Sequence, residues 1–401
     1  MRILFLTPQL PYPPQKGTAL RNWGLIKGLT VRHEVSLLSF TSPTRDVAIA
    51  PPLADACDRI VTVPQPTRST RRRIQEMARS RLPDMALRLA SDEYNEALQR
   101  WLASHAFDVV QIEGIELARY LGITRTAQQD ALIVFDDHNC EYLLQERTFL
   151  TDLYSPARWS GAAYSFVQWR RLRHYEAEIC RSADRVVAVS DADAEALRQL
   201  VPRLDVTVIP NGIDTDAYQS SRATRGKEEA CLLFTGTMDF RPNVDAVLWF
   251  ARNVLPLVKA QVPNVQFLIV GQRPHGRLSA LRRDPAITLT GWVEDVKPYF
   301  RQATVYVAPL RMGGGTRLKL LEAMSMEKPV VATSLGAEGY PVENGRELLL
   351  ADTPRSFAKA VVSLLEDRTR RSELAQTARA FVEDKYDWRS IVPRLEDIYR
   401  V

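Results

Sequence analysis

The segment Leu310–Met324, LRMGGGTRLKLLEAM, combines residue types that bind a phosphorylated ligand. Its glycines let a ligand approach the backbone and expose amide N–H groups. The helix predicted to follow adds partial positive charge at its N-terminus, which favours an anion. Arg317 and Lys319 could reach a diphosphate there, and the Glu322 carboxylate could accept hydrogen bonds from two neighbouring hydroxyls, as on a ribose. The same residues could instead form a flexible turn and an i,i+3 ion pair between Lys319 and Glu322.

Two better known phosphate motifs are absent from the sequence. It contains no G-x-x-x-x-G-K-[ST], so the glycines do not belong to a P-loop. No G-x-G-x-x-G follows the first predicted strand, which argues against a dinucleotide fingerprint. The glycine segment must therefore be interpreted from the elements around it.

Short β-branched runs alternate with helical patterns, which predicts parallel sheets covered by helices on both faces. In the first half, a helix is predicted at 18–30 and strands at 2–7, 33–40, 58–63, 107–113, 131–137, 184–190 and 206–210. In the second half, helices are predicted at 243–261, from Thr316 and from Pro354, with strands at 231–236, 265–271, 286–291, 304–309, 328–333 and 347–352.

The polar stretch 219–230 separates the two series and is predicted to be an interdomain linker. The expected domains are therefore 1–218 and 231–380, and a terminal helical segment, 381–401, is expected to pack back toward the first domain. Ligands of open α/β sheets bind beyond the carboxyl ends of strands, so two such domains in series predict a cleft between them.

The composition is that of an ordinary globular protein with a mild basic excess. The 401 residues carry a net charge of +5, which suits an acidic ligand or an anionic membrane surface and is weaker than most nucleic-acid binders show. The four cysteines have no metal or redox spacing and are expected to be reduced, as in the cytoplasm. No signal peptide and no run of roughly 18 apolar residues is found, so any membrane contact is expected to be peripheral.

The sequence from 308 to 333, APLRMGGGTRLKLLEAMSMEKPVVAT, resembles the donor-site signature of glycosyltransferase family 4. VIPNGID, RVVAVSDADAEAL, GWVEDV and IVGQRP also fall where that family has them. The resemblance implies an α/β protein of GT-B fold, with two Rossmann-like doubly wound domains facing a central cleft. It also implies retaining transfer of a sugar from a nucleotide-diphosphate sugar to a hydroxyl, without a metal or other cofactor. Within the family, the chain looks most like sugar transferases of bacterial exopolysaccharide clusters.

The resemblance assigns part of the donor site to the glycine segment. Glu322 matches the second glutamate of the family's E-x7-E pattern, which binds the nucleotide ribose. The first glutamate would fall at Gly314, so contacts to the donor sugar are expected from backbone N–H groups of Gly314, Gly315 and Thr316. Trp292 and Val293 are expected to present backbone groups to the nucleobase.

The family's G-R…K pair after the first strand of the second domain is also missing. Thr237 and Pro242 stand in its place, and Arg241 lies beside the absent lysine. We infer that neutralisation of the diphosphate has moved largely to Arg317 and Lys319. Such cations are needed because charge develops on the diphosphate as the glycosidic bond breaks.

The first domain is expected to supply the rest of the site. The proline-rich loop after the first strand ends in Gly17, where the family has a glycine facing the donor phosphates and the acceptor; the alternative is a rigid surface loop. His138 follows a strand, and the resemblance places it near the donor sugar, with Asp136 or Asp137 as groups that could orient it. Glu113 ends another strand and is expected either to polarise the acceptor hydroxyl or to cap a helix.

The expected partners are a nucleotide sugar and a saccharide or lipid-linked acceptor, with no nucleic acid. The segment 69–84 is basic and amphipathic, which suits an anionic bilayer at the inner membrane face or only a solvated surface. The stripe of apolar residues in 158–180 favours a core-facing helix over a membrane anchor. Two rival functions stay open: a nucleotide-sugar epimerase of GT-B fold and a non-catalytic homologue that binds nucleotide sugars.

Overall fold

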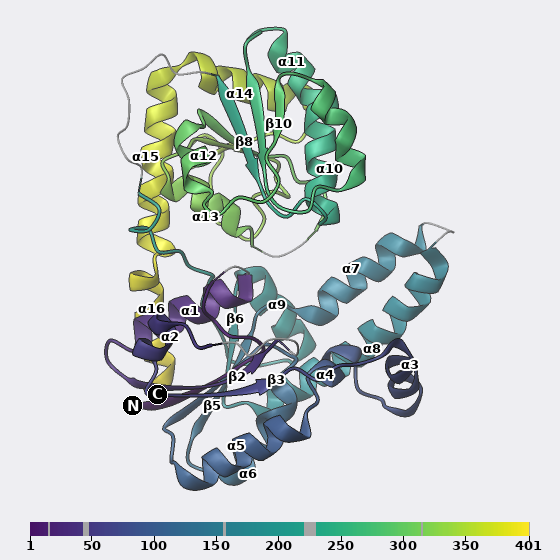
Figure 1. The fold of residues 1–401 in the computed structure, drawn as a ribbon, viewed down its shortest axis with the longest axis vertical. Helices are drawn as coiled ribbons and strands as arrows, with labels where there is room; N and C mark the ends of the chain where they lie inside the picture. The colour runs from purple at the N-terminus through teal and green to yellow at the C-terminus, as the bar shows by residue number, and fades with distance from the viewer. Residues whose placement is uncertain (15–16, 43–47, 155–157, 220–229, 314–315, 401) are drawn as a thin grey trace. The chain divides into compact units, whose positions relative to one another are not determined.

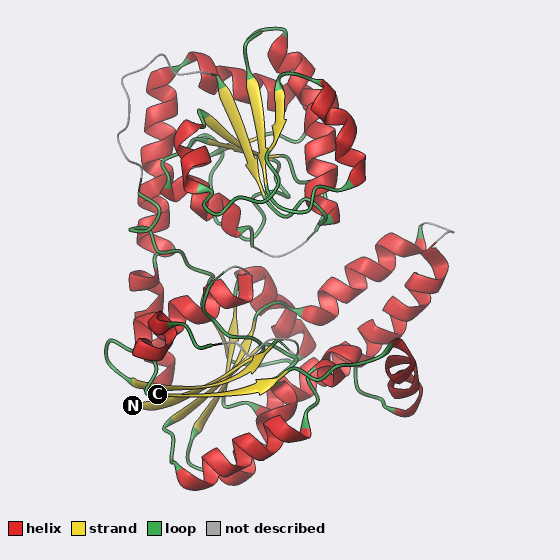
Figure 2. Cartoon of the chain, viewed as in Figure 1, coloured by secondary structure: helices red, strands yellow, loops and turns green. Residues whose placement is uncertain are grey.

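The computed structural model describes residues 1–14, 17–42, 48–154, 158–219, 230–313 and 316–400. They belong to two compact units, one of Met1–Asn211 with Ile391–Val401 and one of Gly212–Ser390. Each unit contains a parallel sheet, drawn yellow in Figure 2, with helices packed on both faces. The predicted architecture of two doubly wound α/β domains is therefore confirmed.

The sheet of the first unit has the strand order β3-β2-β1-β4-β5-β6-β7. Its strands are β1 (Arg2–Thr7), β2 (Glu34–Thr41), β3 (Arg59–Pro64), β4 (Val109–Glu113), β5 (Leu132–Asp137), β6 (Arg185–Ala188) and β7 (Val206–Val208). Each lies within two residues of its predicted bounds. All neighbours pair in parallel, and β1 and β4 are almost completely buried, because helices cover both faces.

Helices cover this sheet on both sides, as Figure 1 shows. They are α1 (Gly17–Leu29), α2 (Pro51–Ala56), α3 (Thr70–Arg79), α4 (Asp84–Arg88), α5 (Asp92–Ser104), α6 (Leu121–Ala127), α7 (Glu141–Leu153), α8 (Trp159–Ser182), α9 (Asp191–Leu200) and most of α16 (Trp388–Tyr399). The last helix belongs to this unit from Ile391 onward, although it follows the second unit in the chain. Its Val392 packs on Gly28 of α1, where even a Cβ would lie 2.4 Å from a Val392 methyl.

The helices α7 and α8 form a two-helix arm that extends away from the strands of the first unit (Figure 1). Phe149 of α7 stacks on Trp169 of α8 with ring centroids 6.0 Å apart, and Phe166 lies against both rings. The expected core-facing stripe is only half right. Leu172 and Ile179 are buried, whereas Trp159 and Phe166 toward the far end are exposed, because no sheet lies under that part of α8.

The second unit repeats the topology with six strands in the order β10-β9-β8-β11-β12-β13. They are β8 (Cys231–Thr235), β9 (Gln266–Val270), β10 (Ile287–Leu289), β11 (Val305–Ala308), β12 (Val330–Ala332) and β13 (Leu349–Leu350), again within two residues of prediction. Its α-helices are α10 (Arg241–Trp249), α11 (Leu255–Lys259), α12 (Lys297–Gln302), α13 (Leu318–Ser325), α14 (Pro354–Glu366) and α15 (Arg368–Lys385).

The helix predicted over 243–261 is interrupted. A π-helical turn at Phe250–Val254 separates α10 from α11. Pro256, the second residue of α11, has no N–H with which to continue a regular helix, which explains the break.

The compact units meet in sequence at Asn211 and Gly212, ahead of the polar stretch 219–230. Residues just after this point bond within the second unit: Thr215 Oγ1 lies 2.5 Å from Asp387 Oδ2, just after α15, and Arg379 of α15 donates to the Tyr218 carbonyl at 2.8 Å. Residues 220–229 of the predicted linker lie outside the described part of the chain. No helix within that described part is both long and apolar enough to cross a bilayer.

Candidate functional site

In the second unit, Lys319 occupies a tight polar niche at the start of α13. Its Nζ donates to Asn243 Oδ1 at 2.9 Å and lies 4.5 Å from the centre of the Phe234 ring. Gly236 has a φ of 151°, and a Cβ there would come within 2.8 Å of Nζ. A glycine at the end of β8 thus makes room for the ammonium, as the close approach of a ligand or cation to backbone requires.

Burial and the neighbouring Arg317 charge together lower the pKa of Lys319 to about 7, although the Glu322 charge opposes the shift. Although the residue as a whole is only partly buried, its ammonium is enclosed by Asn243, Phe234 and Gly236. Near neutral pH this lysine is therefore about half charged. An anion placed beside it would restore the proton, since opposite charge favours the charged form.

Glu322 lies one turn further along α13 and accepts a hydrogen bond from the Tyr218 hydroxyl at 3.0 Å. Burial raises the pKa of Glu322, and the bond from Tyr218 and the Lys319 charge counteract this rise. Among the described residues, neither ion pair nor hydrogen bond joins Lys319 to Glu322, so the i,i+3 pair considered from the sequence is not formed. Tyr218 was missed because it lies 104 positions away in the chain.

Arg317 and Thr316 lie just before α13, against two glycines. A Cβ on Gly313 would sit 3.3 Å from Arg317 Nη2, and one on Gly339 would sit 2.8 Å from Thr316 Cγ2. The guanidinium therefore folds close over the backbone of the loop that precedes the helix. Gly314 and Gly315, predicted to contact the donor sugar, lie outside the described residues.

The remaining predicted donor residues follow the carboxyl ends of strands β8 and β10 in the same sheet. Arg241 is the first residue of α10 and is exposed. Trp292 follows β10 with 71% of its surface exposed, and Val293 packs against the apolar cluster that also contains Tyr218. Contact of these residues with a nucleobase or diphosphate stays a prediction, and the exposed indole offers a stacking surface as well.

In the first unit, His138 and Glu113 form a close pair at the carboxyl ends of neighbouring strands. Glu113 ends β4 opposite Asp136 of β5, and His138 follows β5 directly. His138 Nε2 lies 2.6 Å from Glu113 Oε2, so we assign the Nε2 proton to this bond. Glu113 has no exposed surface. It orients His138, and the expected roles of polarising an acceptor hydroxyl or capping a helix stay predictions.

Asp136 does not orient His138, because its carboxylate is bound by Arg21. The guanidinium of Arg21 donates to Asp136 Oδ2 at 2.7 and 3.0 Å and to the carbonyls of Ile209 and Pro210. Burial raises the pKa of Asp136 to about 6 even though Arg21 lowers it. Asp137 faces Glu176 instead, and burial together with that carboxylate raises its pKa strongly.

Three further side chains that sequence reasoning missed hold Glu113 in place. Gln111 Nε2 donates to Glu113 Oε1 at 3.0 Å, and the Tyr399 hydroxyl donates to Gln111 Oε1 at 3.0 Å. With its amide oriented to donate, Asn22 Nδ2 lies 2.7 Å from Glu113 Oε2. Gln111 lies two residues before Glu113 on β4, whereas Tyr399 and Asn22 come from α16 and α1, which no local pattern in the sequence could have linked to Glu113.

The pair favours a protonated histidine. Burial lowers the pKa of His138, but the Glu113 hydrogen bond and charge outweigh it, so the net pKa is raised. With His138 protonated, two buried carboxylates, Glu113 and Asp136, are balanced by His138 and Arg21. The cluster is then close to neutral, as a buried charged group must be to persist.

Glu113, Asp136 and His138 also lie close enough to be considered as metal ligands, with one donor atom from each within 4.8 Å of the others. The fit is poor, because the Arg21 guanidinium already binds Asp136 at 2.7 Å and would repel a cation. Gly17, predicted to face the donor phosphates, is the exposed first residue of α1.

Comparison with solved structures supports the same fold over the whole chain. The Anabaena protein HepE in complex with UDP and glucose aligns with a TM-score of 0.67 at 17% identity, covering 100% of each chain. Sucrose-phosphate synthase from Thermosynechococcus elongatus aligns with a TM-score of 0.73 at 16% identity, covering 100% of this chain and 98% of that one. At such identities the likeness shows the fold alone, which is GT-B.

Curated relatives match shorter stretches. An uncharacterised 44.6 kDa protein in the cps region of Klebsiella pneumoniae is 25% identical over 168 residues, 40% of this chain and 43% of its own. Phosphatidyl-myo-inositol mannosyltransferase of Mycobacterium tuberculosis is 30% identical over 210 residues, 49% of this chain and 54% of its own. The chain thus spans about half the length of these relatives.

Family profiles match both units. Residues 229–367 match the family described as Glycosyl transferases group 1, and residues 17–217 match Glycosyltransferase Family 4. The two matches coincide with the units that carry Lys319 and His138 respectively. Since the second profile alone extends over half of the chain, the protein belongs to glycosyltransferase family 4.

Proposed function

We propose that the protein transfers a sugar, with retention of configuration, from a nucleotide-diphosphate sugar to a hydroxyl of a saccharide or lipid-linked acceptor. The observation that carries the proposal is the setting of Lys319. An enclosed ammonium with a pKa near 7 lies beside Arg317 and one turn before a carboxylate, Glu322. A diphosphate beside these two cations would favour the charged form of Lys319.

The chemistry assigned to this site is stabilisation of the leaving group. When the bond between the anomeric carbon and the diphosphate oxygen breaks, negative charge develops on the diphosphate. Arg317, protonated Lys319 and the amide groups at the start of α13 would interact with that charge. Glu322 would accept hydrogen bonds from the ribose hydroxyls, oriented by its bond from Tyr218.

His138 is proposed to bind the donor sugar through Nδ1, because Nε2 is already held by Glu113. Its raised pKa favours a donated hydrogen bond from an imidazolium. That protonation state argues against direct stabilisation of positive charge at the anomeric carbon, which a second cation would oppose. Glu113 is then a positioning residue, with Gln111 and Asn22 behind it.

The acceptor, the biosynthetic setting and the place of action belong to the same proposal. A relative encoded in a cps region supports exopolysaccharide assembly, and relatives named as phosphatidyl-myo-inositol mannosyltransferases support a lipid-linked acceptor. Both are consistent with a cytoplasmic protein in peripheral contact with the inner membrane face. No metal is required in this mechanism, since Arg317 and Lys319 supply the cations and Arg21 blocks the carboxylate cluster of the first unit.

A donor screen tests the proposal. UDP-, GDP- and ADP-sugars are compared by thermal shift, and the donor that raises the melting temperature is then assayed for transfer. Glu322→Ala, Lys319→Ala and His138→Ala should each reduce transfer at least tenfold. Glu366→Ala, Lys359→Ala and His174→Ala remove the same residue types from exposed helix positions and should leave it unchanged.

Two results would overturn the assignment. Epimerised donor after incubation without any acceptor would identify an isomerase. Donor binding with no transfer to any saccharide or lipid-linked acceptor, in wild-type protein and variants alike, would indicate a binding protein.

A further inference from the structure

Large apolar side chains are exposed mainly in one region of the first unit. Of the fourteen that are exposed among the described residues, nine lie in α3, in the loop after it, or in the two-helix arm. They are Ile74, Leu82, Leu150, Leu153, Tyr154, Trp159, Tyr164, Phe166 and Val167. Tyr154 and Trp159 expose 86% and 61% of their surface. Scattered apolar residues are ordinary on a protein surface, but a gathering of this kind marks an interaction site.

A hydrogen bond and a shared pocket connect α3 to α8 and so join these residues into one surface. Arg171 of α8 donates to the Met77 carbonyl at 2.9 Å, and Gln168 accepts from the Asp84 backbone N–H at 2.7 Å. Between the two helices lies a pocket of about 210 Å³ whose lining includes Ile74 and Tyr164. Further along the arm, the Trp159 indole donates to the Leu153 carbonyl at 3.3 Å and so stays beside the end of α7.

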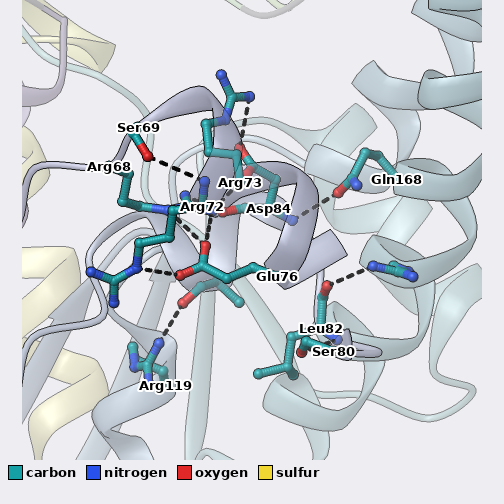
Figure 3. A network of polar contacts seen from close by, with 12 residues as sticks. Arg68, Ser69, Arg72, Arg73, Glu76, Ser80, Leu82, Asp84, Arg119 and Gln168 are labelled. Atoms are coloured by element: carbon teal, nitrogen blue, oxygen red, sulfur yellow. Dashed lines mark hydrogen bonds and ion pairs between the residues drawn. The ribbon is translucent and has the colours of Figure 1, made fainter. Parts of the chain in front are cut away.

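The same region carries a strong positive charge. Residues 68–84 contain six arginines and two carboxylates, a net charge of +4. Figure 3 shows where the carboxylates are used: Glu76 binds Arg68 and Arg72, and Asp84 binds Arg68 and Arg73. The other three arginines, at positions 71, 79 and 81, are exposed and have no acidic partner among the described residues.

Stability does not explain this charge. Three consecutive arginines, Arg71–Arg73, stand in the first turn of α3, where the helix dipole favours acidic residues. The helix buries none of its residues, so packing contributes little to it. Instead it is held by the Ser69 cap, whose side chain accepts from the Arg72 N–H, and by the Arg68 ion pairs. The arginines in the first turn therefore lower the stability of α3, while their side chains are exposed on the protein surface.

We propose that α3 and the arm together form a surface that binds an anionic phospholipid bilayer. Arginines attract the acidic headgroups, while tyrosine and tryptophan settle at the boundary between headgroups and hydrocarbon. The pocket between α3 and α8 adds the apolar side chains of Ile74, Met77 and Leu82 to this surface. The inference deepens the proposed function, because it identifies the surface that faces the membrane. It rests on the proposed function in one respect: a lipid-linked acceptor gives the protein a reason to bind the membrane.

Vesicle flotation tests the proposal without any sugar transfer. Wild-type protein is mixed with vesicles of phosphatidylcholine alone or with phosphatidylglycerol added. It should float only with the anionic vesicles, with binding that weakens as salt is raised. Each arginine near the surface contributes about a fivefold change in binding. The triple variant Arg71→Ala/Arg79→Ala/Arg81→Ala should therefore bind about 100-fold more weakly.

The apolar contribution is tested separately. Tyr154→Ser/Trp159→Ser should reduce binding at high salt, where charge attraction is screened, and should leave the salt dependence in place. The matched controls are Val31→Ser, 81% exposed in a different region, and Arg282→Ala/Arg283→Ala in the second unit. Both controls should bind vesicles like the wild type.

Three outcomes would overturn the inference: no flotation with anionic vesicles, unchanged binding of both test variants, or a lipid-free dimer in sedimentation that Tyr154→Ser/Trp159→Ser abolishes. The last would assign the surface to a second copy of the chain. Thermal shift with the nucleotide sugar is measured for every variant. An unaltered donor response with lost vesicle binding separates this surface from the donor site, and a failed donor response in wild type counts against the proposed function alone.

Discussion

The setting of Lys319 predicts that binding of the donor takes up a proton. In the free protein, burial and Arg317 hold the pKa of Lys319 at about 7. A diphosphate beside Nζ should return the pKa toward its ordinary value of about 10.4, because opposite charge favours the ammonium. Above pH 7 the free lysine is mostly neutral and must be protonated when the donor binds. Affinity should therefore be constant in mild acid and fall as pH rises.

The magnitude follows from the pKa of the free protein. With a folded pKa of about 7, Kd should rise about 30-fold between pH 6 and pH 8.5, equivalent to about 2 kcal/mol. Isothermal titration calorimetry in buffers of different ionisation heat measures both Kd and the protons taken up, which should approach one per donor at the upper pH. An intact nucleotide sugar is the right probe, because its pyrophosphate has no proton to lose in this range.

Variants decide whether Lys319 is the group responsible. Lys319→Met should bind the donor weakly and lose the proton uptake that Lys319 contributes, and Lys319→Arg should lose that part of the pH dependence as well, because arginine stays charged. A wild-type Kd that is constant from pH 6 to pH 8.5 would refute the reasoning. So would a Lys319→Met variant that keeps the wild-type slope, since the titrating group would then be elsewhere.

The remaining predictions concern residues that only the structure revealed. Tyr399→Phe removes the bond to Gln111 and should destabilise the fold by about 1 kcal/mol in urea unfolding, and it should also shift the pH profile of transfer through Glu113; an unchanged profile would exclude a positioning role. Although burial opposes it, hydrogen bonds from Arg389 and Thr215 lower the pKa of Asp387 to about 2, so its stabilisation is present above about pH 4 and lost as pH falls toward 2. Asp387→Asn should therefore lower Tm at pH 7, and the difference from wild type should shrink in acid. Gly236→Ala should weaken donor binding, because a Cβ there displaces the Lys319 ammonium of the donor site. The variant should still unfold cooperatively, with a lower Tm. Chelators should leave transfer unchanged, and loss of activity in EDTA with recovery on adding a divalent cation would contradict the metal-free mechanism.

Much of the architecture could be read from local patterns. β-branched runs predicted every strand of both sheets to within two residues, because parallel strands covered on both faces need continuous apolar side chains. The glycine segment before α13 likewise drew attention to Lys319 and Glu322 through spacing alone. The break between α10 and α11 was missed because the apolar pattern continues across the π-helical turn.

The sequence by itself therefore determined the fold class and the strand ends at which chemistry is expected. Tertiary structure decided which groups meet there. Glu113 pairs with His138, and Asp136 pairs with Arg21. From their positions in the chain alone, either carboxylate could have been the partner of His138. Tyr399 reaches Gln111 from 288 positions away. The periodicity of apolar residues indicates which face of each helix or strand is buried. Side-chain contacts between different elements depend instead on strand order and helix packing, which a short segment of sequence does not determine.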